Sequence, residues 1–330
     1  MNLIKKSIIS TLTYGGIRQW SFTSWEIFRY LTNPNRIEPE SKNIEISLSE
    51  LIKYLDELKN DGIISEKNGF YFLRSNNPEK TIEKRINGDK ISDFKTKRIL
   101  KKIHYLSLLP FIRGIFLSGS LVFGWSNKKS DIDLLIITEK NKIWTARFFL
   151  SGCLMLFRMK RTKKRVENKI CLNHFISSEN LRVTLYSLYN AETYTRLVPL
   201  WLNEKLLKQF IGANSWIKNY ILWGFGKYYG DSRYFSGSYF QIFTQKIFEI
   251  VIQIIGIGPV LEKLLKFWQV DRIKKDPLTS KEGGRVSFDN IQIEFHPNSP
   301  EKKAIDFYNN KLKSLGLFSF KSEENSGLKM

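Results

Sequence analysis

The sequence has little of the chemistry that builds disulfide-linked or zinc-bound folds. Its 330 residues contain two cysteines, Cys153 and Cys171, and three histidines. Two cysteines cannot form a disulfide framework, and so few thiol and imidazole groups leave little room for a zinc site. We therefore expect a reducing compartment and a cytoplasmic protein.

Long uninterrupted apolar runs are also lacking. The two most apolar stretches, residues 143–159 and 247–261, are broken by charged residues such as Arg147 and Glu249. Neither reaches the roughly 18 apolar residues that read as a spanning helix. The apolar run that ends at Leu12 is followed by no small-residue cleavage site, which favours an ordinary first helix over a signal peptide. We expect no transmembrane segment, and peripheral contact with anionic lipid stays open because basic residues lie near the apolar stretches.

Acidic residues are scarce relative to basic ones. There are 32 Asp and Glu against 53 Lys and Arg, which gives a formal net charge of +21. Hydrophobic residues make up 42% of the chain and aromatic residues 14%, enough for a core and too many for a disordered protein. At roughly 100–200 residues per domain the length predicts more than one domain. The excess of positive charge predicts an anionic partner.

Residues 1–75 have the pattern of a small separate domain. Thr23 or Ser24 can cap a helix, and Ser47 opens a second one with the capping box Ser-Leu-Ser-Glu. Asn68-Gly69 between two apolar runs predicts a β-hairpin. Helices followed by a hairpin resemble a winged-helix domain. The face of the second helix that we expect to be buried consists of Leu51, Ile52, Leu55 and Leu58.

A winged helix implies DNA binding, but the charges of this segment do not favour it. Residues 1–75 contain 10 Lys and Arg and 9 Asp and Glu, a net charge of +1. A helix that enters DNA should be basic, because neutralised phosphates supply most of the affinity. We expect a packing or acceptor-presenting module, with a DNA-binding regulator as an alternative. The acidic residues of the candidate reading helix are Glu50, Asp56, Glu57 and Asp61.

Residues 76–112 predict a basic linker helix that Pro110 ends. Residues 76–115 contain 10 Lys and Arg and 4 Asp and Glu, a net charge of +6. Lys95, Lys97, Arg98, Lys101 and Lys102 contribute to this charge, and Leu100, Ile103, Leu106 and Leu109 supply the buried side.

The segment from Gly114 to Thr138 carries the chemistry. An apolar strand leads into the turn Ser118-Gly119-Ser120, and a second buried strand begins at Asp131. Asp131 and Asp133 are two residues apart on this strand, so both carboxylates face the same way. Two such carboxylates repel each other unless a cation such as Mg²⁺ lies between them. Gly119 lets a phosphate approach the backbone, and Ser120 offers a hydroxyl and an N–H, so the segment predicts metal-assisted phosphoryl or nucleotidyl transfer.

Gly119-Ser120 followed by Ser130-Asp131-Ile132-Asp133 resembles the signature of the DNA polymerase β-type nucleotidyltransferase superfamily. The resemblance is strong from Gly114 to Thr138, and the order of strands and helices agrees to about residue 176. It implies an α+β fold, with a mixed sheet and flanking helices, over a core of residues 113–180. It also implies a nucleoside triphosphate as substrate and paired acids that bind divalent metals, Mg²⁺ being expected. The residues expected to bind the nucleotide are Ser118, Gly119, Ser120, Ser130 and Arg147.

Active members of that superfamily add a third carboxylate on a later strand, and the corresponding run 169–175 here has none. Asn173 occupies the expected position, where an amide oxygen can ligate Mg²⁺ but cannot act as a base. Glu167 and Glu179 flank the strand, and Glu294 in a later strand-like run is a weaker substitute. A chain without any such substitute would work with a single metal or would have lost catalysis.

A second basic cluster runs from Arg158 to Arg165. Residues 116–175 contain 12 Lys and Arg and 4 Asp and Glu, a net charge of +8. Three interpretations stay open: phosphate or RNA binding at the rim of the active site, attraction to an anionic membrane, and a solvated loop. Arg147 is the better candidate for contact with substrate, because an Arg in an apolar helix normally needs an anionic partner.

Residues 181–320 predict a mainly helical domain, and residues 321–330 a flexible tail. Apolar residues have helical spacing over 181–188, 193–206 and 241–270, and the aromatic loop 228–234 is a candidate lining for an acceptor pocket. The leading hypothesis is a Mg²⁺-dependent nucleotidyltransferase that moves a nucleoside monophosphate to an acceptor. Nucleic acid and other anionic molecules are candidate acceptors. An inactive nucleotide-binding or regulatory protein of the same fold is the alternative, and oligomeric state stays open.

Overall fold

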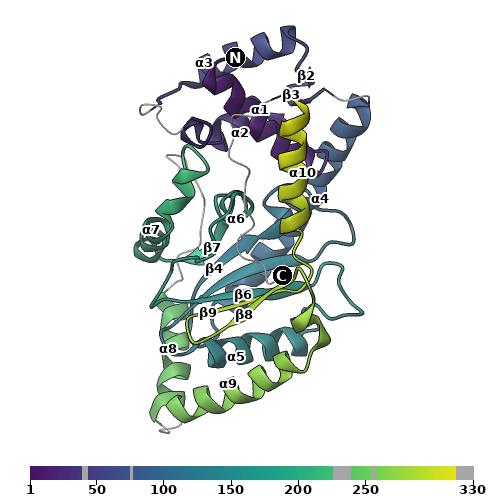
Figure 1. The fold of residues 1–330 in the computed structure, drawn as a ribbon. Coiled ribbons are helices and arrows are strands. Elements are labelled where there is room, and N and C mark those ends of the chain that lie inside the picture. Colours follow the sequence, from purple (N-terminus) through teal and green to yellow (C-terminus); the bar gives the residue numbers. More distant parts are fainter. Residues whose placement is uncertain (39–43, 75–76, 226–238, 255–257, 317–330) are drawn as a thin grey trace.

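The computed structural model describes residues 1–330 except 39–43, 75–76, 226–238, 255–257 and 317–330. The described residues form a mixed α+β structure with a three-stranded and a six-stranded sheet (Figure 1). Within these ranges, no helix combines the length and apolar character needed to cross a membrane.

The helices are α1 (Leu3–Gly16), α2 (Ser24–Arg29), α3 (Leu48–Asn60), α4 (Pro78–Leu106), α5 (Ile143–Leu156), α6 (Leu188–Tyr194), α7 (Glu204–Ala213), α8 (Tyr239–Ile254), α9 (Gly258–Lys274) and α10 (Glu301–Ser314). Short 3-10 helices are η1 (Pro34–Arg36), η2 (Gly119–Leu121), η3 (Ser215–Asn219) and η5 (Pro277–Ser280). The strands are β1 (Phe22–Thr23), β2 (Ile64–Lys67), β3 (Phe70–Leu73), β4 (Ile112–Ser118), β5 (Ile132–Thr138), β6 (Ile170–Ser177), β7 (Val198–Leu202), β8 (Arg285–Phe288) and β9 (Gln292–His296).

The N-terminal unit consists of α1–α3 and the small sheet, in strand order β1-β3-β2. Both predicted helix starts are confirmed, because Thr23 and Ser47 each form a capping box with the Glu three residues later. Asn68-Gly69, both at positive φ, form the predicted hairpin turn. The prediction for Ile52 was wrong. This side chain is 39% exposed, since it lies about 100° around the helix from the buried face of Leu51, Leu55 and Leu58.

The C-terminal helix α10 completes the core of this unit. Ile305, Tyr308 and Leu312 are buried there with residues of α1 and α2. The hydroxyl of Tyr308 lies 2.5 Å from that of Ser10. The N-terminal unit therefore joins both ends of the described chain, which the sequence pattern of residues 1–75 did not indicate.

Helix α4 runs from the N-terminal unit to the large sheet (Figure 1). It ends at Leu106, a turn before the predicted stop at Pro110, and the Ser107 hydroxyl donates to the His104 carbonyl. Ile99, Ile103 and Leu106 pack into the main core. The predicted helix is therefore present, and it ends at Leu106 instead of at Pro110.

The large sheet has strand order β7-β4-β5-β6-β9-β8, with β5 parallel to β6 and the other neighbours antiparallel. Helices cover both faces, so the middle strands are apolar along nearly their whole length. Side chains of α4, α5 and α9 cover one face, and side chains of α6, α7 and η3 the other.

The C-terminal half is less helical than predicted. Residues 181–186 have no regular structure, and the predicted helix 193–206 contains the edge strand β7. Pro199 accounts for this correction, because proline disrupts a helix interior but is tolerated in an edge strand. The stretch 241–270 is divided between α8 and α9. The strand predicted around Glu294 is confirmed as β9, and with β7 and β8 it extends the sheet beyond the boundary predicted at residue 180. The loop 228–234 and the tail 321–330 lie outside the described residues.

Candidate metal and nucleotide site

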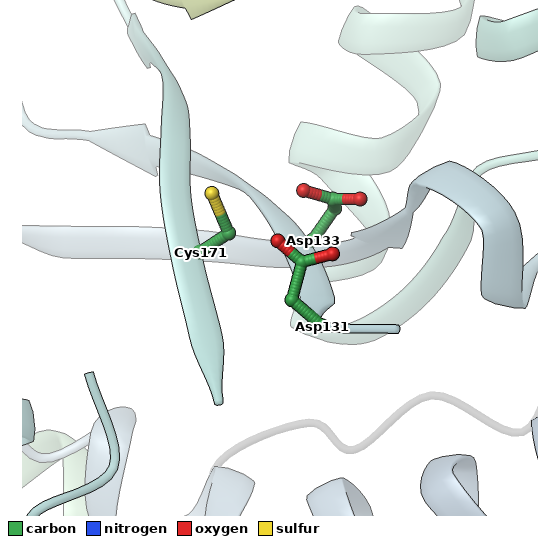
Figure 2. A group of neighbouring side chains, drawn as sticks. All are labelled: Asp131, Asp133 and Cys171. Carbon is green, nitrogen blue, oxygen red and sulfur yellow. The ribbon is translucent and has the colours of Figure 1, made fainter. Parts of the chain in front are cut away.

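Asp131, Asp133 and Cys171 form a cluster at one end of the two parallel strands. Asp131 directly precedes β5, Asp133 is its second residue, and Cys171 lies on the neighbouring β6. One ligand atom of each lies within 4.8 Å of the others, and the side chains point toward one another (Figure 2). Cys171 was not among the predicted site residues, because its place depends on the strand register.

The pairing of β5 with β6 brings Asn173 to the same cluster. Asp133 is paired with Cys171, and Leu135 with His174, so β6 holds one more residue than β5 between these pairs. The Asn173 amide donates a hydrogen bond of 2.9 Å to Asp133 Oδ1. Asn173 therefore lies beside the carboxylates as predicted, and it acts on them as a neutral donor.

Burial and mutual repulsion dominate the electrostatics of the carboxylate pair. Burial, and after it the charge of Asp131, raises the pKa of Asp133 from 3.8 to about 7. Arg161 opposes this rise, and its guanidinium lies 3.0 Å from Asp131 Oδ2. Burial and the two carboxylates raise the pKa of the Cys171 thiol to about 12, so it stays protonated at neutral pH.

The Gly-Ser turn packs directly against one carboxylate. Ser118, the last residue of β4, is paired with Asp133 across the antiparallel ladder. Gly119 has a φ of +69°, and a Cβ built there would lie 2.2 Å from Asp133 Oδ2. The position therefore requires glycine both for its backbone conformation and for the space beside it. Ser120 follows in η2, with its hydroxyl 3.3 Å from that of Ser126.

Lys95 of α4 holds the loop that precedes Asp131. Its side chain is buried, with 1% of the residue exposed, and its ammonium donates to the carbonyls of Asn127, Lys128 and Ser130 at 2.8, 3.2 and 2.6 Å. The Ser130 hydroxyl accepts from the Asn127 N–H at 2.9 Å. Sequence reasoning counted Lys95 only for its charge, and no local pattern distinguishes it from its exposed neighbours. In the described structure, the Ser130 side chain therefore stabilises this loop through its bond to Asn127.

The three glutamates considered as substitutes for a third acid lie elsewhere. Glu179 pairs with Lys140 at 2.8 Å, and Glu167 accepts from the neighbouring Asn168. Glu294 is buried beside Arg285. Among the residues that the structure describes, the one metal-ligand group of three or more acids, histidines or cysteines is that of Asp131, Asp133 and Cys171. None of the three glutamates that the sequence left open as substitutes therefore belongs to this group.

The donor atoms of the cluster suit one hard divalent cation. Two carboxylates supply charged oxygens, the ligands that Mg²⁺ prefers. The raised pKa of Asp133 indicates that its ionised form is unfavourable in the metal-free protein, and a bound cation would stabilise that form. The protonated Cys171 thiol is a poor ligand for such an ion. With Asn173 in place of a third acid, these residues favour one cation over two.

Arg147 lies apart from the Gly-Ser turn. It lines a pocket of about 430 Å³ whose other lining residues include Asn173 and Cys171. Its Nη1 donates a hydrogen bond of 2.6 Å to Gln269 Oε1 on α9. Burial, and then the charge of Arg272, lowers its pKa to about 10.

The structure thus brings Asp131, Asp133, Asn173 and the turn at Gly119 together, and places Arg147 in the adjoining pocket. The chain matches no protein-family model, no curated protein and no solved structure.

Proposed function

We propose that this protein is a Mg²⁺-dependent nucleotidyltransferase that moves a nucleoside monophosphate from a nucleoside triphosphate to an acceptor. One observation carries the proposal: a glycine at positive φ, at the end of β4, packs against the carboxylate of Asp133 on β5, with Asp131 beside it. A Gly-Ser turn next to paired carboxylates supplies both phosphate donors and a cation site.

The residues of the site have distinct roles in this proposal. Asp131 and Asp133 would hold the cation, which when bound neutralises phosphate charge and polarises the reacting phosphoryl group. The backbone at Gly119 and the hydroxyl and N–H of Ser120 would bind the triphosphate. An acceptor oxygen forms a bond to the α-phosphorus, the bond to pyrophosphate breaks, and the acceptor proton passes to solvent. Asn173 orients Asp133 through its amide.

The neutral Asn173 also supports a second candidate function. Within the described residues, no third carboxylate joins the metal-ligand group, so a nucleotide-binding or regulatory protein without transfer activity is the second candidate. The two functions share the binding site and differ in whether pyrophosphate is released.

For the N-terminal unit we propose a winged-helix-like module that packs or presents the acceptor. Three helices followed by a hairpin have the required order. The exposed acidic residues of α3 remain the argument against DNA reading, and a gel-shift series across salt concentration tests it, since phosphate contacts give a steep salt dependence. We propose a cytoplasmic location, because the expected nucleoside triphosphate substrate is found there.

Transfer is tested with each ribonucleoside triphosphate labelled at its α-phosphate, Mg²⁺ and a low-molecular-weight cell extract as the source of acceptor. The expected result is labelled acceptor with matching pyrophosphate release, both lost on chelation and in the Asp131→Asn/Asp133→Asn double variant. The variant Glu179→Gln, which removes a carboxylate beyond the opposite end of β6 from the cluster, should keep full activity. Transfer that survives in the double variant would overturn the assignment. Nucleotide binding without transfer would favour the second candidate function.

A further inference from the structure

The pocket beside the carboxylates lies on the side away from the Gly-Ser turn. In the sheet, β5 has β4 and its turn on one side and β6 on the other. The pocket is built on the β6 side, from β6, α5, α9 and the basic loop between α5 and β6. Cys171 and Asn173 line the end that reaches the carboxylates. A molecule in this pocket would therefore approach the cation site opposite the triphosphate.

Positive charge outweighs negative charge in this pocket, because five Lys and Arg side chains line it and its lining carboxylate, Asp276, already pairs with Lys163 at 3.4 Å. Arg147, Lys160 and Arg272 all line it, and in the described part of the chain none of the three has an ion pair with a carboxylate. Arg147 Nε is buried without a hydrogen-bond partner, and the one bond of this guanidinium to a side chain goes to the neutral Gln269. A guanidinium with a buried, unpartnered N–H and no counter-charge is costly, so Arg147 indicates that an anion normally binds here, with the half-buried Lys160 and the exposed Arg272 beside it.

The same pocket has an apolar wall that continues onto the surface. Phe148, Met155 and Trp268 line it while remaining 39%, 58% and 49% exposed. The rings of Phe148 and Trp268 form a T-shaped contact with a centroid distance of 6.2 Å. Beyond the pocket, the end of α5 and the outer face of α9 expose further large apolar side chains. These are Leu156, Phe157, Leu264 and Phe267. Cations beside exposed apolar side chains suit a ligand that has an anionic group and an apolar portion.

We infer that this pocket binds the acceptor, and that the acceptor is an organic phosphate with an apolar portion. Its phosphate pairs with Arg147, Lys160 and Arg272, and its apolar portion lies against Phe148 and Trp268. The guanidinium of each arginine can donate two parallel hydrogen bonds to phosphate oxygens, and the lysine ammonium adds a compact positive charge. The role as acceptor rests on the proposed nucleotidyl transfer, but binding to the pocket requires neither nucleotide nor Mg²⁺.

Hexyl phosphate, inorganic phosphate and hexanol are suitable calorimetric probes, each titrated into the full-length protein without nucleotide or Mg²⁺. Hexyl phosphate should bind tighter than phosphate by about tenfold or more, and hexanol should not bind. Arg147→Gln and Arg272→Gln should each weaken hexyl phosphate by about tenfold. Arg272 is exposed at the rim, so its variant tests the pocket even where the buried substitution perturbs folding. Lys275→Gln, which removes an exposed cation that directly follows α9 and pairs with Asp271, is the matched control and should bind normally.

Vesicles separate the two sources of such a phosphate. Sedimentation with phosphatidylcholine vesicles that contain phosphatidic acid, lost in Arg272→Gln and absent for phosphatidylcholine alone, would identify a lipid headgroup. Hexyl phosphate binding without vesicle binding would identify a soluble phosphate ester. The Asp131→Asn/Asp133→Asn variant should keep hexyl phosphate binding, so a failed nucleotidyl-transfer test leaves this one intact. The inference would be overturned if neither hexyl phosphate nor the phosphatidic acid vesicles bound the protein. It would also be overturned if Arg147→Gln and Arg272→Gln bound hexyl phosphate as tightly as wild type.

Discussion

Replacing Asp133 by Asn should stabilise the metal-free protein at alkaline pH. The pKa of Asp133 is raised from its ordinary 3.8 to about 7, chiefly by burial. One pH unit of pKa change corresponds to about 1.4 kcal/mol, so ionising Asp133 in the folded protein costs at most about 4 kcal/mol. Its side chain keeps some solvent contact and shares the repulsion with Asp131, so we expect a gain of about 2 kcal/mol in the variant.

The sign of the pH dependence follows from the direction of the pKa change. Below pH 3.8 Asp133 is protonated in both the folded and unfolded chain, and the substitution gains nothing. Between 3.8 and about 7 the unfolded chain loses its proton first, so this residue lowers the free energy of unfolding as pH rises. Above about pH 7 the full cost is present. The stability difference between variant and wild type should therefore grow from near zero at low pH to its maximum at pH 8.

Urea unfolding followed by tryptophan fluorescence, in chelator and over this pH range, measures the difference. Asp93→Asn, at an exposed ion pair with Lys97 on α4, is the control and should show a small difference that changes little with pH. Added Mg²⁺ should stabilise wild type at pH 8 and leave Asp133→Asn nearly unchanged. A variant that is no more stable than wild type at pH 8 would refute the claim that Asp133 is ionised at a cost.

Three substitutions test the packing around the site. Gly119→Ala should abolish nucleotide binding, measured by calorimetry, and destabilise the protein by about 1–3 kcal/mol, because its Cβ would meet Asp133 in a left-handed backbone conformation. Gly88→Ala should also lower the urea midpoint although Gly88 lies within α4, since its Cβ would lie 2.3 Å from the Gly124 carbonyl oxygen. Lys95→Met should lower the melting temperature and weaken nucleotide binding, because three carbonyls of the loop before Asp131 lose their donor, at about 1–3 kcal/mol for each group left unsatisfied.

Matched controls distinguish these effects from general ones. Gly212→Ala in α7, where a Cβ meets nothing within 4 Å, should be neutral or stabilise by up to about 1 kcal/mol. Lys97→Met, on the exposed side of the same helix as Lys95, should leave both measurements unchanged. The packing described here would be contradicted if Gly88→Ala had the same urea midpoint as Gly212→Ala. It would also be contradicted if Lys95→Met had the same melting temperature and nucleotide affinity as Lys97→Met.

Local signals in the sequence predicted local structure well. The capping boxes at Thr23 and Ser47 and the turn at Asn68-Gly69 depend on neighbouring residues alone, and each is present. The two aspartates are brought together for the same reason, since their spacing on one strand sets their direction. Helical spacing over 193–206 failed as a signal, because apolar residues of an edge strand and its flanking turns produced a similar pattern.

The rest of the site depends on contacts between distant segments. Cys171 and Asn173 reach Asp133 through a parallel register that holds one extra residue in β6. Arg161, one of several similar residues in the basic loop, is the one that pairs with Asp131. Lys95 is buried because α4 crosses the loop before Asp131. None of these contacts leaves a local pattern in a single sequence, so only the fold distinguishes them.

The central claim is a cation-dependent nucleotide site at the paired aspartates, and calorimetry tests it most directly. Each of the common ribonucleoside triphosphates is titrated, with Mg²⁺ and with chelator, into wild type, Asp131→Asn/Asp133→Asn and the control Glu179→Gln. We predict that at least one nucleotide binds wild type and Glu179→Gln in Mg²⁺, and that chelation or the double substitution abolishes this binding. Absence of binding to wild type for every nucleotide, or binding that the double variant retains unchanged, would contradict the claim.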